Sequence, residues 1–195
     1  MTIIYIILIL LQAAVIVYFI RQGRKKTVNA HVAPAADTYE GLRNLAVNVT
    51  PEQLKLTIPD DRLFVFGVIM DWNMGEAIVS LAAYVTGAAN MYFNTGEGIT
   101  GGGKNPIVGE AAVAFVVAAQ DYVERGISVS TADLPTRGCV RFHLLTNHGI
   151  YAMQEQIKHI QDGTSPYIPL FESGNKVMTE MQAGGVGNYK DITLN

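Results

Sequence analysis

The first twenty residues constrain this chain more than any other segment, because they form an almost uninterrupted apolar run. Between Thr2 and Ile20, only Thr2 and Gln12 are clearly polar. A helix rises about 1.5 Å per residue, so this run would reach roughly 28 Å, close to the roughly 30 Å hydrocarbon core of a bilayer. We therefore predict a transmembrane helix over residues 1–21.

The charges on the two sides of this run differ. Four cations follow it closely, whereas no lysine or arginine precedes it. Such an excess marks the cytoplasmic side of a span, so we expect a single-pass protein of the cell membrane with its N-terminus outside and its C-terminal domain in the cytoplasm. A cleaved secretory leader is the alternative, although a basic cluster ahead of the cut is unlike a normal cleavage region. The cations expected to contact anionic lipid headgroups are Arg21, Arg24, Lys25 and Lys26.

Composition limits the remaining possibilities. A formal net charge of −3 provides no broad basic surface, so nucleic acid is not an expected partner. The single cysteine, Cys139, cannot form an intramolecular disulfide, which suits a reducing compartment. Residues 22–36 lack apolar periodicity and are predicted to form a basic, flexible linker. Residues 37–182 are long enough for one hydrophobic core, and residues 183–195 form a Gly-rich tail.

Short helical and strand signals alternate after the linker, which predicts an α+β domain. Asp37 and Glu40 mark the start of a short first helix, and Thr50-Pro51-Glu52-Gln53 favours one further helical turn. Apolar runs bounded by turn residues then predict three antiparallel strands, a long helix, two more strands and a last helix. The predicted strands are Leu63 to Met70, Ala77 to Val85, Asn90 to Thr95, Cys139 to Thr146 and Ile150 to Gln154, with an edge segment at Ile127 to Ser130, a turn at Asp71 to Gly75 and a last helix at Phe171 to Met181.

The clearest helix of the domain is predicted from Pro106 to Arg125. Asn105 and Pro106 are typical of a helix start, and Gly126 is typical of a helix end. Valines leave apolar surface on more than one side of this helix, so either the rest of the domain or a partner chain must cover it. The valines considered for a partner interface are Val113, Val116, Val117 and Val123.

The predicted order, with a long helix packed on a roughly five-stranded antiparallel sheet, resembles the roadblock/LC7 and longin group of profilin-like folds. The resemblance covers about Thr38 to Met181. It rests on the strand and turn beginning at Leu63 and on the glycine-rich approach to the long helix. The family implies a domain that dimerises or docks onto partners, small GTPases among them, and is rarely an enzyme. The predicted membrane anchor departs from the usual soluble form, and no functional residue is carried over.

Two glycine motifs precede the long helix. Gly96 to Gly101 matches G-x-G-x-x-G, but this dinucleotide fingerprint belongs to a parallel βαβ unit and the strands here are predicted to be antiparallel. Gly98 to Lys104 fits G-x-x-x-x-G-K, but Asn105 stands where Ser or Thr would bind magnesium. The loop either cradles an anion with backbone N–H groups or uses its glycines only to cross the sheet edge. The candidate anion loop comprises Gly98, Gly101, Gly102, Gly103 and Lys104.

Other residues with catalytic or metal-binding chemistry form no clear constellation. Asp71 and Glu76 have the spacing of paired carboxylates, but two acids around Trp72-Asn73-Met74-Gly75 are more typical of a solvated hairpin tip. Cys139 is interpreted as a small buried residue rather than a nucleophile. The histidines lack the helical i, i+4 pair of zinc proteases, so no metal or cofactor is expected. They are His31, His143, His148 and His159.

These patterns favour a non-enzymatic interaction or structural subunit. Its cytoplasmic domain would bind itself or other subunits of a membrane assembly through the helix from Pro106 to Arg125 and a sheet edge. The alternative is a nucleotide- or GTPase-responsive regulator that uses the loop from Gly96 to Lys104. An enzyme with a dispersed site is a third possibility, for which a pocket near Asp71, Glu76 or His143 would be expected.

Overall fold

The computed structural model describes residues 38–96 and 98–184. The predicted transmembrane helix over residues 1–21, its four interface cations and the linker over residues 22–36 lie outside this part of the chain. Only the first two residues of the predicted tail are described. The predictions for the membrane anchor and its orientation therefore stay predictions.

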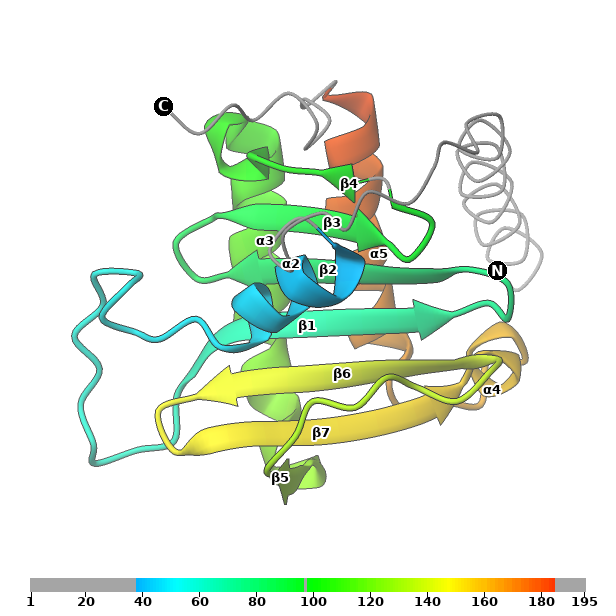
Figure 1. Cartoon of the computed structure of the whole chain (residues 1–195). Coiled ribbons are helices and arrows are strands. Elements are labelled where there is room, and N and C mark those ends of the chain that lie inside the picture. The colour runs from blue at the N-terminus through cyan, green and yellow to red at the C-terminus, as the bar shows by residue number, and fades with distance from the viewer. Residues whose placement is uncertain (1–37, 97, 185–195) are drawn as a thin grey trace.

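One antiparallel sheet of seven strands organises the domain, in the order β4-β3-β2-β1-β6-β7-β5 (Figure 1). The α+β prediction is confirmed, whereas the predicted number of about five strands is too low. The additional strands are the short edge strands β4 and β5, of which only β5 was anticipated as an edge segment. The bounds are β1 Val65–Asn73, β2 Ile78–Tyr84, β3 Ala89–Phe93, β4 Gly98–Ile99, β5 Ile127–Val129, β6 Cys139–Thr146 and β7 Gly149–Gln156.

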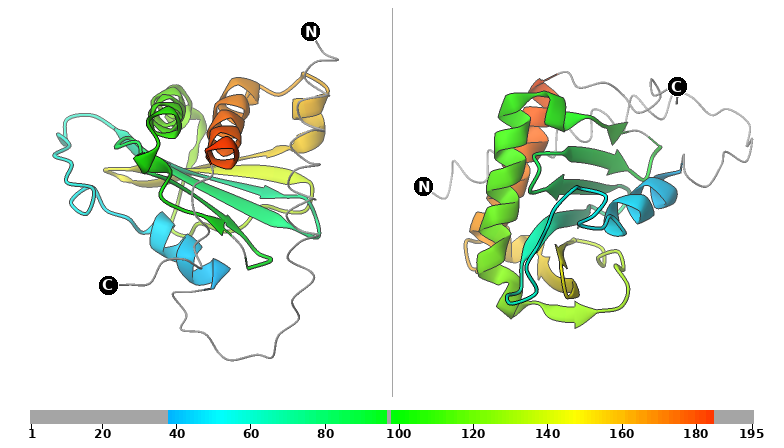
Figure 2. Two further views of the ribbon diagram at one scale, coloured as in Figure 1. Left: turned by 90° about the horizontal axis from the view of Figure 1, so that it is seen from above. Right: turned by 90° about the vertical axis from the view of Figure 1, so that its left-hand side faces the viewer.

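Two long helices, α3 (Pro106–Ala119) and α5 (Ile168–Ala183), lie side by side on one face of the sheet (Figure 2). Asn105 caps α3 by accepting a hydrogen bond from the Ile107 backbone N–H, and the helix continues as the 3-10 turn η3 (Gln120–Arg125). Phe115 and its apolar neighbours are buried between the helices and the sheet. The helix predicted from Pro106 to Arg125 is thus confirmed in its extent.

The apolar character of this segment is accounted for by its packing. By length and hydropathy alone, Pro106–Arg125 qualifies as a candidate membrane span among the described residues. Its buried residues instead join the core that the sheet, α3 and α5 share. A core helix with neighbours on two sides needs apolar residues around much of its circumference.

The opposite face of the sheet is covered more thinly. The nine-residue helix α2 (Tyr39–Val47) lies across it (Figure 1), and apolar residues of the segments that precede β1 and β6 complete the cover. Thr38, rather than the expected Asp37, caps α2 by accepting from the Gly41 N–H. The further turn expected at Thr50 is present, with reciprocal bonds between Thr50 and Gln53.

Strand β1 continues through three residues that were expected to form a turn. Asp71 pairs with Ser80 on β2 and with Arg141 on β6, so the predicted turn at Asp71 to Gly75 is wrong in its first half. Met70 and Trp72 point into the core beneath α3 and α5, and Asp71 points to the α2 face. Strand alternation therefore places an acid between two large apolar residues without breaking the strand. A short helix, α4 (Ile157–Gln161), also lies between β7 and α5.

Candidate functional site

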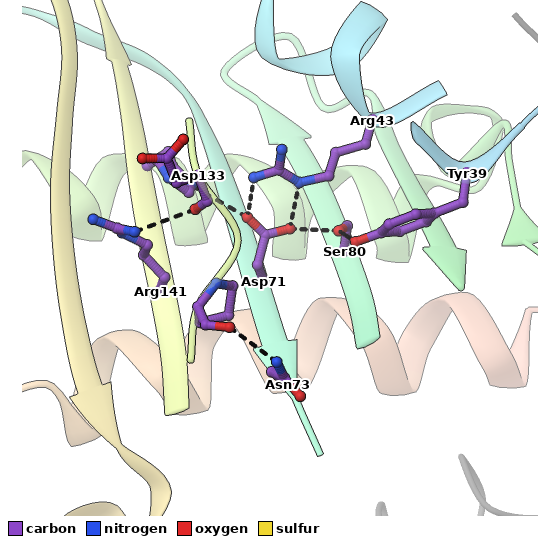
Figure 3. Close-up of polar contacts among 9 residues, drawn as sticks. Tyr39, Arg43, Asp71, Asn73, Ser80, Asp133 and Arg141 are labelled. Atoms are coloured by element: carbon purple, nitrogen blue, oxygen red, sulfur yellow. Dashed lines mark hydrogen bonds and ion pairs between the residues drawn. The ribbon is translucent and has the colours of Figure 1, made fainter. Parts of the chain in front are cut away.

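A buried cluster of polar side chains lies between the sheet and α2 (Figure 3). The Asp71 side chain, from the middle of the sheet, is fully buried at its centre. Arg43 on α2 grips this carboxylate with two bonds, from Nε to Oδ1 at 2.9 Å and from Nη2 to Oδ2 at 2.6 Å. Such a bidentate pair is strong and geometrically specific. It joins α2 to the strand at the centre of the sheet.

Two hydroxyl groups extend the cluster. Ser80 on β2 donates to Asp71 Oδ1, because a carboxylate can only accept. Tyr39 on α2 lies 2.9 Å from the Ser80 oxygen, and it donates because the Ser80 proton is already used. Tyr84, also buried on this face, donates to the backbone carbonyl of Ala46 at 2.8 Å. Side-chain hydrogen bonds from Arg43 to Asp71, from Tyr39 to Ser80 and from Tyr84 to Ala46 thus add to the apolar packing of α2 on the sheet.

His143 on β6 completes the cluster and is its least satisfied member. Its Nδ1 lies 3.2 Å from Asp71 Oδ2, and its side chain is fully buried. Despite this short distance, neither ring nitrogen has a hydrogen-bond partner among the described residues. A buried polar group without a partner costs stability, so this ring marks a local conflict in an otherwise satisfied network.

Burial and pairing set the charge of these groups. Burial alone raises the pKa of Asp71, but the hydrogen bonds from Arg43 and, to a smaller extent, the proximity of the His143 ring outweigh it and hold the pKa below its ordinary value. Burial lowers the pKa of Arg43, and pairing with Asp71 more than offsets this. Burial raises the pKa of Tyr39 to about 12. At neutral pH the cluster thus contains an ion pair and a neutral phenol.

The cluster is closed to ligands in the described structure. A surface hollow of about 450 Å³ lies beside the first turn of α2, lined in part by Tyr39, Arg43 and Leu134. Asp71, Ser80 and His143 do not line it. The carboxylate that would be needed for acid–base chemistry is therefore inaccessible to a ligand in this hollow. The arrangement stabilises the packing of α2 on the sheet.

Sequence reasoning missed this cluster because Asp71 was assigned to a solvated hairpin tip. Its intended partner Glu76 is exposed in the turn after β1, whereas Asp71 is buried, so the two carboxylates do not form a pair. The detectable signal was alternation, because Ile69, Asp71 and Asn73 share one side of an extended strand and Met70 and Trp72 the other. Arg43 carried no such signal, since its partner lies 28 residues away.

The glycine-rich loop is explained by close packing. Gly98 lies in β4, and Gly101 has a φ of +78°, which favours glycine. A Cβ on Gly102 would come within 2.8 Å of Val108 Cγ1 and 3.0 Å of the Ala89 carbonyl oxygen. The loop thus fits tightly against the β2–β3 hairpin before α3 begins, and an anion site here stays a prediction.

The remaining residues with potential chemistry are dispersed. Cys139 is buried and accepts a hydrogen bond from Thr136 Oγ1 at 3.3 Å. His159 pairs with Glu155 at 2.8 Å near the surface at α4, and His148 lies in the turn between β6 and β7. His31 is outside the described part of the chain. Among residues 38–96 and 98–184, no three metal-binding side chains gather.

The outer side of α3 leaves apolar side chains exposed. Ile107 and Val117 are 58% and 60% exposed, and Ala114 lies between them. At 100° per residue, these three residues and the exposed Glu110 fall within an arc of about 80° of α3. We call this set the outer stripe, and it comprises Ile107, Glu110, Ala114 and Val117.

A groove borders the outer stripe at Val117. It has a volume of about 280 Å³ and lies between α3 and the backbone that enters β1. Gln120 fixes its floor, accepting from the Val65 N–H at 2.9 Å and donating to the Leu63 carbonyl at 3.2 Å. The groove is lined by Arg62, Leu63, Phe64, Val65, Val85, Val116, Val117 and Gln120.

The four valines considered for a partner interface divide between core and surface. Val116 and Val123 are buried in the core, so they are unavailable to a partner. Val113 is half-buried, and Val117 is exposed. The rest of the domain therefore covers one side of the helix, and the other side remains uncovered in the described structure.

Comparison with protein-family models, with curated proteins and with solved structures found no match. The resemblance to the roadblock/LC7 and longin group therefore stays a prediction from element order.

Proposed function

We propose that this protein is a non-enzymatic subunit of a membrane-associated assembly, tethered by its N-terminal segment and binding a partner or a second copy through its α+β domain. The observation that carries the proposal is the outer stripe of α3, where Ile107 and Val117 are more than half exposed. Large apolar side chains that gather on one surface and adjoin a groove are typical of binding sites.

The two faces of the sheet support this choice of surface. The α2 face holds the ion pair between Arg43 and the fully buried Asp71, but the hollow beside it does not reach Asp71. The α3 face has exposed apolar side chains and a groove in which Gln120 is hydrogen-bonded to the backbone of Leu63 and Val65. A preformed surface of this kind loses little conformational entropy when it binds.

The proposal is tested by purifying the tagged full-length protein from its own membranes in mild detergent, with native mass and partner identification. Val117→Glu places a charge in the apolar contact and is expected to abolish a stoichiometric association. Leu45→Glu is the matched control, because Leu45 is 58% exposed but lies on α2, on the opposite face of the sheet. Equal association of both variants, or a wild-type protein that is a lone monomer, would sink the proposal.

A further inference from the structure

One oxygen of the buried Asp71 carboxylate is approached by side chains from two different elements. Arg43 on α2 donates from Nη2 to Oδ2 at 2.6 Å, and Nδ1 of His143 on β6 lies 3.2 Å from the same oxygen. The other oxygen, Oδ1, accepts from Ser80 on β2 as well as from Nε of Arg43. If α2 moved away, Oδ1 would therefore keep a donor, and His143 would be in place to replace Arg43 at Oδ2.

The presence of α2 opposes a positive charge on His143. The Arg43 guanidinium already occupies Oδ2, and Arg141, two residues along β6 on the same face of the sheet, is a second cation. Removing α2 would take one of these cations away and leave Oδ2 open to the ring. The titratable and charged groups around the ring are Asp71 on β1, Arg43 and Tyr39 on α2, Arg141 on β6 and Asp133 in the segment before β6 (Figure 3), and the residues of β7 on this face, Ile150, Ala152 and Gln154, are uncharged.

We propose that α2 is a releasable cover of the sheet, and that protonation of His143 promotes its release by passing the Asp71 carboxylate from Arg43 to the ring. Histidine is the side chain whose charge ordinarily changes between pH 8 and pH 5. The carboxylate keeps its own charge over that range, because the pKa of Asp71 is held below its ordinary value. A proton that binds the released state more strongly than the docked state shifts the population towards release.

Release of α2 changes which surface of the domain is accessible. Phe66, Ile69, Tyr84 and Tyr92 are buried in the apolar cluster that α2 shares with the sheet, and release would uncover them. This inference goes beyond the proposed function and does not depend on the outer stripe, since α3 lies on the opposite face.

The test is hydrogen exchange, measured by mass spectrometry, on the full-length protein in mild detergent at pH 7.5 and pH 5.5, with rates corrected for the intrinsic effect of pH. The α2 amides should lose protection by about tenfold at the lower pH, whereas those of α5 should not. His143→Gln keeps a donor near Asp71 but cannot gain a charge, so it should remove this loss. His159→Gln is the matched control and should retain it, because His159 pairs with Glu155 at α4.

Equal α2 protection of the wild type at the two pH values would overturn the inference, as would a loss that persists in His143→Gln. An equal loss in α5 would also overturn it, because that result would report unfolding of the whole domain. If His143→Gln does not fold, NMR of isotope-labelled histidine in the wild type takes its place. His143 must then gain its proton over the pH range in which α2 loses protection, and a ring that stays neutral there would overturn the inference.

Discussion

The two faces of the sheet achieve helix packing in different ways. On one face, α3 and α5 bury a continuous apolar core that includes Phe115, Phe142 and Phe171. On the other, the short helix α2 depends on Arg43, Asp71 and the hydroxyl groups around them. The first face is stabilised mainly by non-directional burial of apolar area, and the second by a few directed bonds. On the α3 face, Ile107 and Val117 stay exposed beside a groove, whereas on the α2 face the directed bonds converge on the fully buried Asp71.

The largest expected effect comes from the apolar face. Phe115→Ala removes a fully buried ring between α3, α5 and the sheet, and we expect a loss of about 3–5 kcal/mol in the free energy of unfolding. Urea unfolding of the full-length protein in mild detergent measures this loss. The single tryptophan, Trp72, is a suitable probe because it is buried edge-on against Phe171. A loss below about 1 kcal/mol would mean that this core is loosely packed.

The second-largest loss of unfolding free energy is expected from breaking the ion pair on the α2 face. Arg43→Met leaves the buried Asp71 carboxylate without its main partner, which should cost about 3 kcal/mol. Adding Asp71→Asn removes the stranded charge, so the double variant should be more stable than Arg43→Met alone. A double-mutant cycle of unfolding free energies measures this coupling. Strictly additive losses would show that the two side chains do not stabilise α2 as a pair.

Acid should weaken the α2 face selectively. The pKa of Asp71 is lowered in the folded state, so the pair contributes stability above the unfolded pKa of about 3.9 and loses it as the pH falls through the lower folded value. Unfolding free energies measured between pH 5 and pH 2.5 should therefore fall more steeply for the wild type than for Asp71→Asn. Parallel curves would contradict a charged, paired Asp71.

A smaller loss is expected at the glycine loop, where the apolar face meets the sheet edge. Gly102→Ala would push a methyl group against Val108 and the Ala89 carbonyl, costing about 1–3 kcal/mol. The matched variant Lys104→Ala changes an exposed side chain in the same turn and should leave the unfolding free energy within about 0.5 kcal/mol. If Lys104→Ala lost more unfolding free energy than Gly102→Ala, the packing explanation of the glycines would be wrong.

The long helix and the main strands of the sheet were predicted best, because their apolar residues follow helical or strand periodicity. Pro106 and Gly126 bounded the long helix, and apolar runs located β2, β3, β6 and β7, because each signal is local. The α2 face was predicted poorly, because the burial and pairing of Asp71 depend on Arg43 and His143, which are distant in sequence. The outer stripe was only partly foreseen, because helical period alone does not say which valines the sheet and α5 will cover.

The most direct test of the division between the two faces is hydroxyl-radical footprinting of the full-length protein in its native membrane assembly and after dissociation in detergent. Exposed apolar side chains on both faces serve as reporters. Our account predicts that Ile107 and Val117 are protected in the assembly, whereas Leu45 on α2 and Leu134 beside it react equally in both states. Protection of Leu45 and Leu134 with unchanged Ile107 and Val117 would contradict it and place the binding surface on the α2 face.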